Sequence, residues 1–155
     1  MEAKNRTVDV IVEAKNLYTS PPADPWVDKY TSLEDDEGYA STFGEPNSNF
    51  ETGVYKGYNI TWVIKTANPK GEDKGYDVKL NSVYHNPTKG NPNFFDSEEL
   101  YPRGNPKEIT GTITREATGE IKSDTYTIYF AIADEKGNWQ NYPLDPKLQI
   151  RRPSS

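Results

Sequence analysis

The chain has 155 residues, a net charge of −6 at pH 7 and no cysteine. The length suits one domain, and the lack of thiols excludes disulfides, thiolate metal sites and cysteine nucleophiles. An acidic surface repels phosphate backbones and anionic lipid, so nucleic acids and membranes are not expected as partners.

Short runs in the N-terminal half alternate apolar with polar residues, which predicts strands with one buried face. The proline-rich stretch from Ser20 to Pro25 predicts a stiff, extended connection. The acidic stretch from Glu34 to Asn49 is rich in Gly and Asn, which predicts a long loop. In chain order, the strands predicted here are 6–14, 27–33, a short edge strand near 39–43, and 57–65, with 50–55 leading into the last.

The C-terminal half continues the same pattern. The segment 96–101 is the one helix candidate, because Asp96 or Ser97 can cap it and Pro102 ends it. Asp134 and Gly137 occupy the first and fourth positions of a type I turn, which predicts a hairpin. The strands predicted here are 76–85, 107–115, 124–132 and 147–150.

Two of these strands decide the fold class. Trp62 lies on the apolar face of 57–65, and Tyr126 and Phe130 lie on the apolar face of 124–132. A central Trp strand with a later Asp-x-Tyr strand is a hallmark of an immunoglobulin-like sandwich. We therefore predict an all-β protein, an antiparallel β-sandwich of immunoglobulin-like or jelly-roll type with about seven or eight strands. The sandwich domain would span 1–150, with 151–155 as a flexible C-terminal tail.

Catalytic motifs are scarce. The single histidine, His85, has no Gly-x-Ser-x-Gly motif beside it, so we interpret it as a surface or loop residue. Carboxylates adjacent in sequence cannot face each other across a substrate. A hydrolase would therefore need an acidic pair from distant segments.

The acidic run from Glu34 to Gly38 is the candidate metal site. Asp35 and Asp36 offer hard oxygen ligands for Ca²⁺, and Asp24 and Asp28, or Asp96 and Asp145, could join them at one end of the sandwich. The spacing is not that of an EF-hand. A solvated acidic loop is the alternative interpretation.

Many aromatic residues lie in or beside loops rich in Asn and Asp. Flat rings flanked by amides and carboxylates suit sugar binding or a protein interface. Trp26, Trp139 and Tyr142 are the candidates for such ligand binding. The alternative is that these rings plug the open ends of the sandwich.

Several runs, taken in order, resemble the bacterial inclusion-body (PixA/AidA-like) family. They are Val8–Val12, the strand entry Gly57–Trp62, the strand Tyr126–Ile132 and the ending Tyr142–Ile150 with its Asp-Pro pair. Tyr58 stands where that family tends to show Asp. The resemblance implies a cytoplasmic, non-enzymatic bacterial β-sandwich that can accumulate or self-associate, and it assigns no functional residue.

Three functions remain open from the sequence. The leading hypothesis is a non-enzymatic protein that works by binding or by self-assembly into a homo-oligomer through edge strands, with Val8 to Ala14 as the candidate edge. The alternatives are a carbohydrate-binding module with a glycan partner, with or without calcium support, and a hydrolase that uses carboxylates. The chain shows no apolar signal core, which predicts a cytoplasmic location, or a secreted one if the sequence is a mature form.

Overall fold

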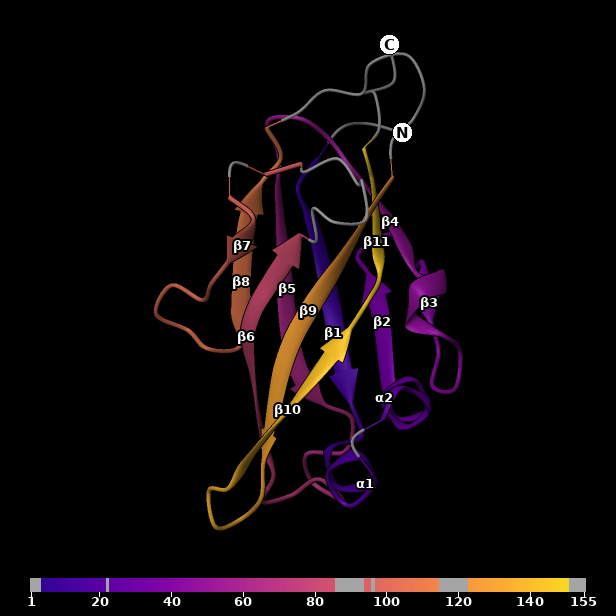
Figure 1. Ribbon diagram of the computed structural model, residues 1–155, viewed down its shortest axis with the longest axis vertical. Helices are drawn as coiled ribbons and strands as arrows, with labels where there is room; N and C mark the ends of the chain where they lie inside the picture. The colour runs from indigo at the N-terminus through magenta and orange to yellow at the C-terminus, as the bar shows by residue number, and fades with distance from the viewer. Residues whose placement is uncertain (1–3, 22, 86–93, 96, 115–122, 151–155) are drawn as a thin grey trace.

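Two β-sheets face each other in the computed structural model, which describes residues 4–21, 23–85, 94–95, 97–114 and 123–150 (Figure 1). The predicted tail 151–155 lies outside the described residues. Two short helices lie beside each other at one end of the molecule, at the bottom of Figure 1. The predicted all-β class is confirmed.

The first sheet is built around the N-terminal strand β1. β1 pairs antiparallel with β2 on one side and parallel with β5 on the other. The prediction that Val8 to Ala14 forms an edge is therefore wrong, because β1 has hydrogen-bonded neighbours on both sides. Across the sheet, the strands are β3 (Ala40–Ser41), β2 (Thr31–Asp35), β1 (Arg6–Val12), β5 (Asn59–Thr66) and β8 (Glu108–Thr112).

The second sheet is built around the long strand β9. Its pairs are antiparallel except for β4 with β11. β10 lies along 128–133 of β9, and β11 lies along 123–125, so the two follow one another on the same side of β9. Across the sheet, the strands are β4 (Glu51–Val54), β11 (Lys147–Ile150), β9 (Ser123–Ala133), β6 (Asp77–His85) and β7 (Glu99–Leu100), with β10 (Trp139–Leu144) also paired to β9.

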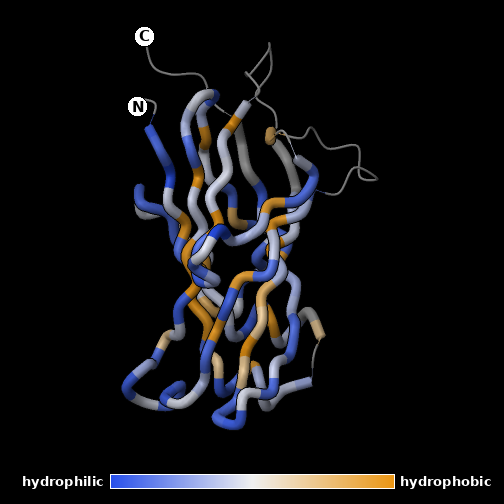
Figure 2. The backbone as a smooth tube through the Cα atoms, turned by 90° about the vertical axis from the view of Figure 1, so that its left-hand side faces the viewer, coloured by the Kyte–Doolittle hydropathy of each residue, from blue (hydrophilic) through white to orange (hydrophobic). Residues whose placement is uncertain are grey.

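The core between the sheets is centred on Trp62, as predicted. The Trp62 side chain is fully buried, and its Nε1 donates a hydrogen bond to the hydroxyl of Tyr126 at 3.1 Å. This bond satisfies the polar atoms of two buried aromatic side chains. Phe130 is also buried and stacks on Tyr142 with ring centroids 5.3 Å apart. Figure 2 shows apolar residues concentrated within the strands and hydrophilic residues at the turns.

The helices occur where extended chain was predicted. α1 (Ala14–Tyr18) follows β1, and α2 (Asp24–Tyr30) replaces the end of the extended connection and the first half of the predicted strand 27–33. Pro25 lies in the first turn of α2, where its missing N–H costs no hydrogen bond. Trp26 and Tyr30, four residues apart, stack with centroids 6.3 Å apart and stabilise the helix. None of the described helices has the length and apolar character needed to cross a membrane.

The loop and helix predictions needed other corrections. The loop predicted from Glu34 begins later, because β2 continues to Asp35. The predicted helix 96–101 is wrong: Glu99 and Leu100 form β7, paired with β6, and Asp96 lies outside the described residues. A main-chain bond from His85 N–H to Glu98 O at 2.7 Å extends this pairing. His85 itself is buried at the end of β6, so its interpretation as a surface residue is also wrong.

Candidate functional site

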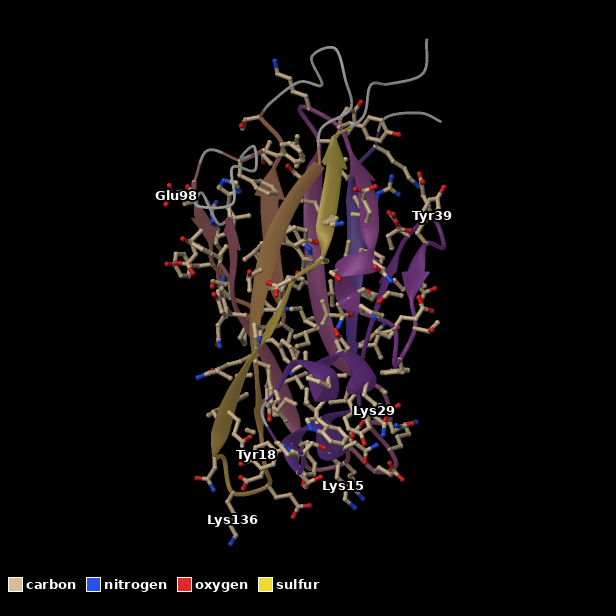
Figure 3. The ribbon with its side chains drawn as sticks, turned by 45° about the vertical axis from the view of Figure 1, so that its right-hand side comes forward. Lys15, Tyr18, Lys29, Tyr39, Glu98 and Lys136 are labelled. Atoms are coloured by element: carbon tan, nitrogen blue, oxygen red, sulfur yellow. The ribbon has the colours of Figure 1, made fainter. Side chains whose placement is uncertain are left out.

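The outer strands of the two sheets present their backbone edges differently. β3 and β7 have two residues each, and such short strands offer little backbone to a partner. They mark the two sides of the molecule: Tyr39 lies beside β3 on one side and Glu98 beside β7 and β8 on the other (Figure 3). The longer outer strands β4, β8 and β10 are the ones to compare.

Side chains of the first sheet cover the edge of β4. The buried Arg6 donates from Nε to the backbone oxygen of Gly53 at 3.0 Å. The guanidinium also forms ion pairs with Asp36 at 2.7 Å and with Glu37 at 3.1 Å. β4 is thereby tied to β1 and to the turn after β2, and its edge is closed.

Proline and a helix protect the edge of β10. Pro143, opposite Tyr129, has no N–H to offer to a further strand. α2 packs against β10 from the side. β10 is therefore unsuited to pairing with another chain.

The edge of β8 is open along its middle. Ile113 N–H donates to Tyr58 O at 3.0 Å and Ile64 N–H donates to Lys107 O at 3.0 Å, so odd-numbered residues of β8 bond to β5. By the alternation of an antiparallel pair, the backbone groups of Thr110 and Thr112 point away from β5. No described residue bonds to these groups. The outward side of the strand is closed at its ends, by Thr114 N–H to Phe94 O at 2.9 Å, by Glu108 N–H to Asn105 O at 3.2 Å and, just before β8, by the N–H of Leu80 in β6 to Pro106 O at 2.7 Å.

A groove of about 410 Å³ runs beside this edge. Its walls come from β8 and from the segment that includes β7. Leu100 and Phe95 approach Gly111 so closely that a Cβ there would lie 2.6 Å from Leu100 Cδ1. The outward side chains of β8 are fixed: Thr110 Oγ1 lies 2.9 Å from Thr61 Oγ1, and Thr112 donates to Asn59 at 2.8 Å. The remaining lining residues are Ser97, Arg103, Asn105 and Glu108.

Trp139 lies apart, on the outer face of the second sheet. Its side chain is 41% exposed, and the Lys79 ammonium lies 4.2 Å from its ring centroid. Beside it, Asn81 donates to Asn141 Oδ1 at 2.9 Å. Opposite Trp139 and Asn141 on β9 are alanines, so this face is flat and carries one exposed indole with two amides.

The other two predicted ligand residues do not join Trp139. Tyr142 lies on the opposite face of β10 and is 1% exposed, with its hydroxyl donating to Gln140 at 2.8 Å. Burial raises the pKa of the Tyr142 hydroxyl to about 12, and Tyr18 adds to the shift. Trp26 lies on α2, half-buried, with Lys29 Nζ 5.3 Å from its ring centroid.

The two predicted metal ligands, Asp35 and Asp36, bond to other groups of the protein. Asp35 is buried and accepts from the N–H groups of Glu37 and Tyr39 and from Thr52 Oγ1, and Asp36 pairs with Arg6. Among the described residues, no group of three or more His, Asp and Glu side chains is arranged to hold a metal ion. A calcium site at Asp35 and Asp36 stays a prediction.

Two of the carboxylates considered as additional ligands, Asp28 from one alternative and Asp145 from the other, lie close together. They line a pocket of about 150 Å³ between α2, the 3₁₀ turn η1 (Asn47–Asn49) and the end of β10. Asp28 Oδ1 accepts from the Asn47 amide at 2.6 Å, and Asp145 Oδ1 accepts from Thr127 at 2.7 Å. One oxygen of each carboxylate therefore serves the fold.

The open β8 edge was missed from the sequence. The signal was present: Thr110-Gly111-Thr112 contains no Lys or Pro, the residues that commonly protect an outer strand. What the sequence lacks is the strand order, which makes β8 an outer strand and β1 a central one.

Comparison with known proteins supports the fold. No family model matches the chain, and no curated protein matches it. Among solved structures, the inclusion body protein PixA from Burkholderia cenocepacia J2315 is similar with a TM-score of 0.55 and 9% identity, over 97% of this chain and 95% of that chain. The resemblance to the PixA-type family is thus confirmed at the level of fold.

A second solved structure, a cysteine protease inhibitor from Entamoeba histolytica, has a TM-score of 0.28 and 14% identity, over 68% of this chain and 88% of that chain. A likeness this low carries no argument about fold or function.

Proposed function

We propose that this protein is a non-catalytic β-sandwich that self-associates by pairing the β8 edge of one copy with that of another. The observation that carries the proposal is the contrast between the outer strands. In the described part of the chain, β4 is closed by Arg6, β10 carries Pro143, and β8 keeps open polar groups at Thr110 and Thr112. An open edge of this kind is a template for a further strand.

Charge supports a second copy as the partner. Two chains of net charge −6 repel each other over most of their surfaces. The centre of the β8 edge carries only threonines and a glycine, so two copies can approach there without opposing like charges. The fold-level likeness to an inclusion body protein accords with this proposal.

Light scattering after size exclusion, over a concentration series, tests the proposal. The wild-type chain should form dimers. Thr110→Lys places two ammonium groups opposite each other at the paired edge and should raise the dissociation constant at least about tenfold. Thr61→Lys is the matched control, since it breaks the same Thr61–Thr110 contact on the same face but lies one strand inside the sheet. A wild-type monomer at every concentration would refute the proposal.

A saccharide is the second candidate ligand, favoured by the face around Trp139. An exposed indole offers a flat surface to the C–H face of a pyranose, and the amides of Asn81 and Asn141 can bond its hydroxyls. This face is separate from β8, so a saccharide could bind without affecting the β8 edge.

A glycan array with and without a chelator tests this candidate. Trp139→Ala should abolish binding, whereas Trp26→Ala on α2 should leave it unchanged. Loss of binding in the chelator arm would support a calcium role for Asp35 and Asp36. An array on which no glycan binds would remove the candidate.

A further inference from the structure

Resting on the proposed function, we infer the register of the partner: β8 pairs with β8 of a second copy in antiparallel orientation, about a twofold axis at Thr110. The five-stranded sheets of the two copies then form one continuous sheet. The groove beside β8, about 410 Å³, is the space that the added strand enters.

The alternation along β8 limits which residues can meet. The residues whose backbone groups point away from β5 can bond only to residues of the second copy whose backbone groups also point away from their own β5. With the axis at Thr110, the N–H and the C=O of Thr110 in one chain both bond to Thr110 of the second chain. On either side, Thr112 N–H meets the open C=O of Glu108. Each chain thereby fills the C=O of Glu108, both groups of Thr110 and the N–H of Thr112.

Neighbouring registers are disfavoured by like charges, by a missing N–H or by a position that is already occupied. An axis at Glu108 opposes two carboxylates, which repel. An axis at Ile109 places Thr112 opposite Pro106, which has no N–H. An axis at Gly111 fills as many backbone groups, but it sets Glu108 opposite Thr114, a place already taken by Phe94, whose O accepts from Thr114 N–H at 2.9 Å.

The twofold arrangement also separates the charges. Glu108 is the charged outward residue of β8, and the other end of the strand presents Thr112 bonded to Asn59. Antiparallel pairing sets the charged end of one copy against the neutral end of the other. Because each β8 edge is used once, the assembly closes at two copies and does not extend into a filament.

Cysteine variants test this register cleanly, because the wild-type chain has no cysteine. Facing residues of a hydrogen-bonded antiparallel pair have Cα atoms about 5.5 Å apart, within the range of a disulfide. Thr110→Cys, mildly oxidised with glutathione disulfide, should form a covalent dimer. Thr112→Cys or Glu108→Cys alone should crosslink at least about tenfold more slowly, because each of these positions lies about 13 Å from the same position in the second chain.

A mixture of Thr112→Cys and Glu108→Cys chains should form the mixed disulfide as readily as Thr110→Cys forms its own. Light scattering on the reduced variants tests dimer formation separately from the register of the pairing. Dimers that crosslink fastest through Thr112→Cys or Glu108→Cys alone would overturn the register and leave the proposed function intact. Equal crosslinking of all three single variants would also overturn the register, since it indicates random collision. Reduced chains that stay monomeric, with the wild type, would overturn both.

Discussion

The edges of β4 and β8 lie on opposite sides of the sandwich (Figure 1). A side chain covers the edge of β4, whereas the middle of the β8 edge has no cover from the described residues. A buried cation, Arg6, reaches from one sheet to the other and bonds the backbone of β4. At β8 the backbone groups of Thr110 and Thr112 meet no described partner. One edge is closed by a specific long-range contact, and the other has no such contact from the part of the chain that the structure describes.

The two edges differ in their use of charged side chains. Arg6 is held by two carboxylates and a carbonyl, an arrangement that works only if all of its partners are in place. The open edge needs no such network, because threonines keep strand geometry and carry no charge. Self-association at β8, as proposed, would use backbone groups that already have strand geometry.

Arg6→Met should give the largest effect, because it removes the cover of β4. The change leaves Glu37, whose side chain is 12% exposed, with only the exposed Lys4 ammonium, at 3.8 Å, as its cation. Breaking a buried ion pair on one side costs about 3 kcal/mol, so the free energy of unfolding in urea should fall by about that amount. The opened β4 edge should also promote aggregation.

Lys65→Met is the control for Arg6→Met. Lys65 pairs with Asp9 at 3.1 Å, but the Lys65 side chain is 52% exposed and the half-buried Asp9 side chain is 34% exposed. A surface pair of this kind contributes less than about 1 kcal/mol. Equal losses for the two variants would contradict the role given to Arg6.

Gly111→Ala should give an intermediate effect at the other edge. The new methyl group would lie 2.6 Å from Leu100 Cδ1 and 2.7 Å from Phe95 Cε1, so the segment lining the groove must move. Overpacking of this kind costs about 1–3 kcal/mol, and dimer formation should weaken with it. Gly71→Ala is the matched control, because its nearest neighbour, Asn68 Cβ, would be 3.8 Å away. Similar thermal unfolding of the two variants would show that the close approach at Gly111 is unimportant.

The alternation of side chains between the two faces of a strand explains part of what the sequence could and could not predict. Val8, Val10 and Val12 share a buried face with Arg6, so the burial of Arg6 could have been read from its position. The same alternation places Trp139 and Tyr142, three residues apart, on opposite faces of β10, which was overlooked. The partners of Arg6 and the outer position of β8 depend on strand order, which no local pattern contains. α2 was missed because seven residues are too few for a clear helical period.

A pH titration gives the smallest expected effect and concerns the anchoring of the groove. Lys107 Nζ donates to Asp77 at 2.7 Å and to Val78 O at 2.9 Å, which ties the chain entering β8 to β6. Burial opposes ionisation of Asp77, but the Lys107 ammonium outweighs it and lowers the pKa of the carboxyl below its ordinary value. Because the folded-state pKa is the lower one, this stabilisation is present above the unfolded pKa and is lost as pH falls through the folded pKa.

Asp77→Asn should therefore lose less stability than the wild type on acidification from about pH 6 to about pH 2, measured by urea unfolding at each pH. The difference should be small, since the Asp77 side chain is 63% exposed and solvent screens the pair. In a Lys107→Met background the same substitution should give a smaller difference, because only the Val78 N–H and the Lys79 charge then lower the pKa of Asp77. A pH-dependent difference of undiminished size without Lys107 would place its origin elsewhere than in this anchor.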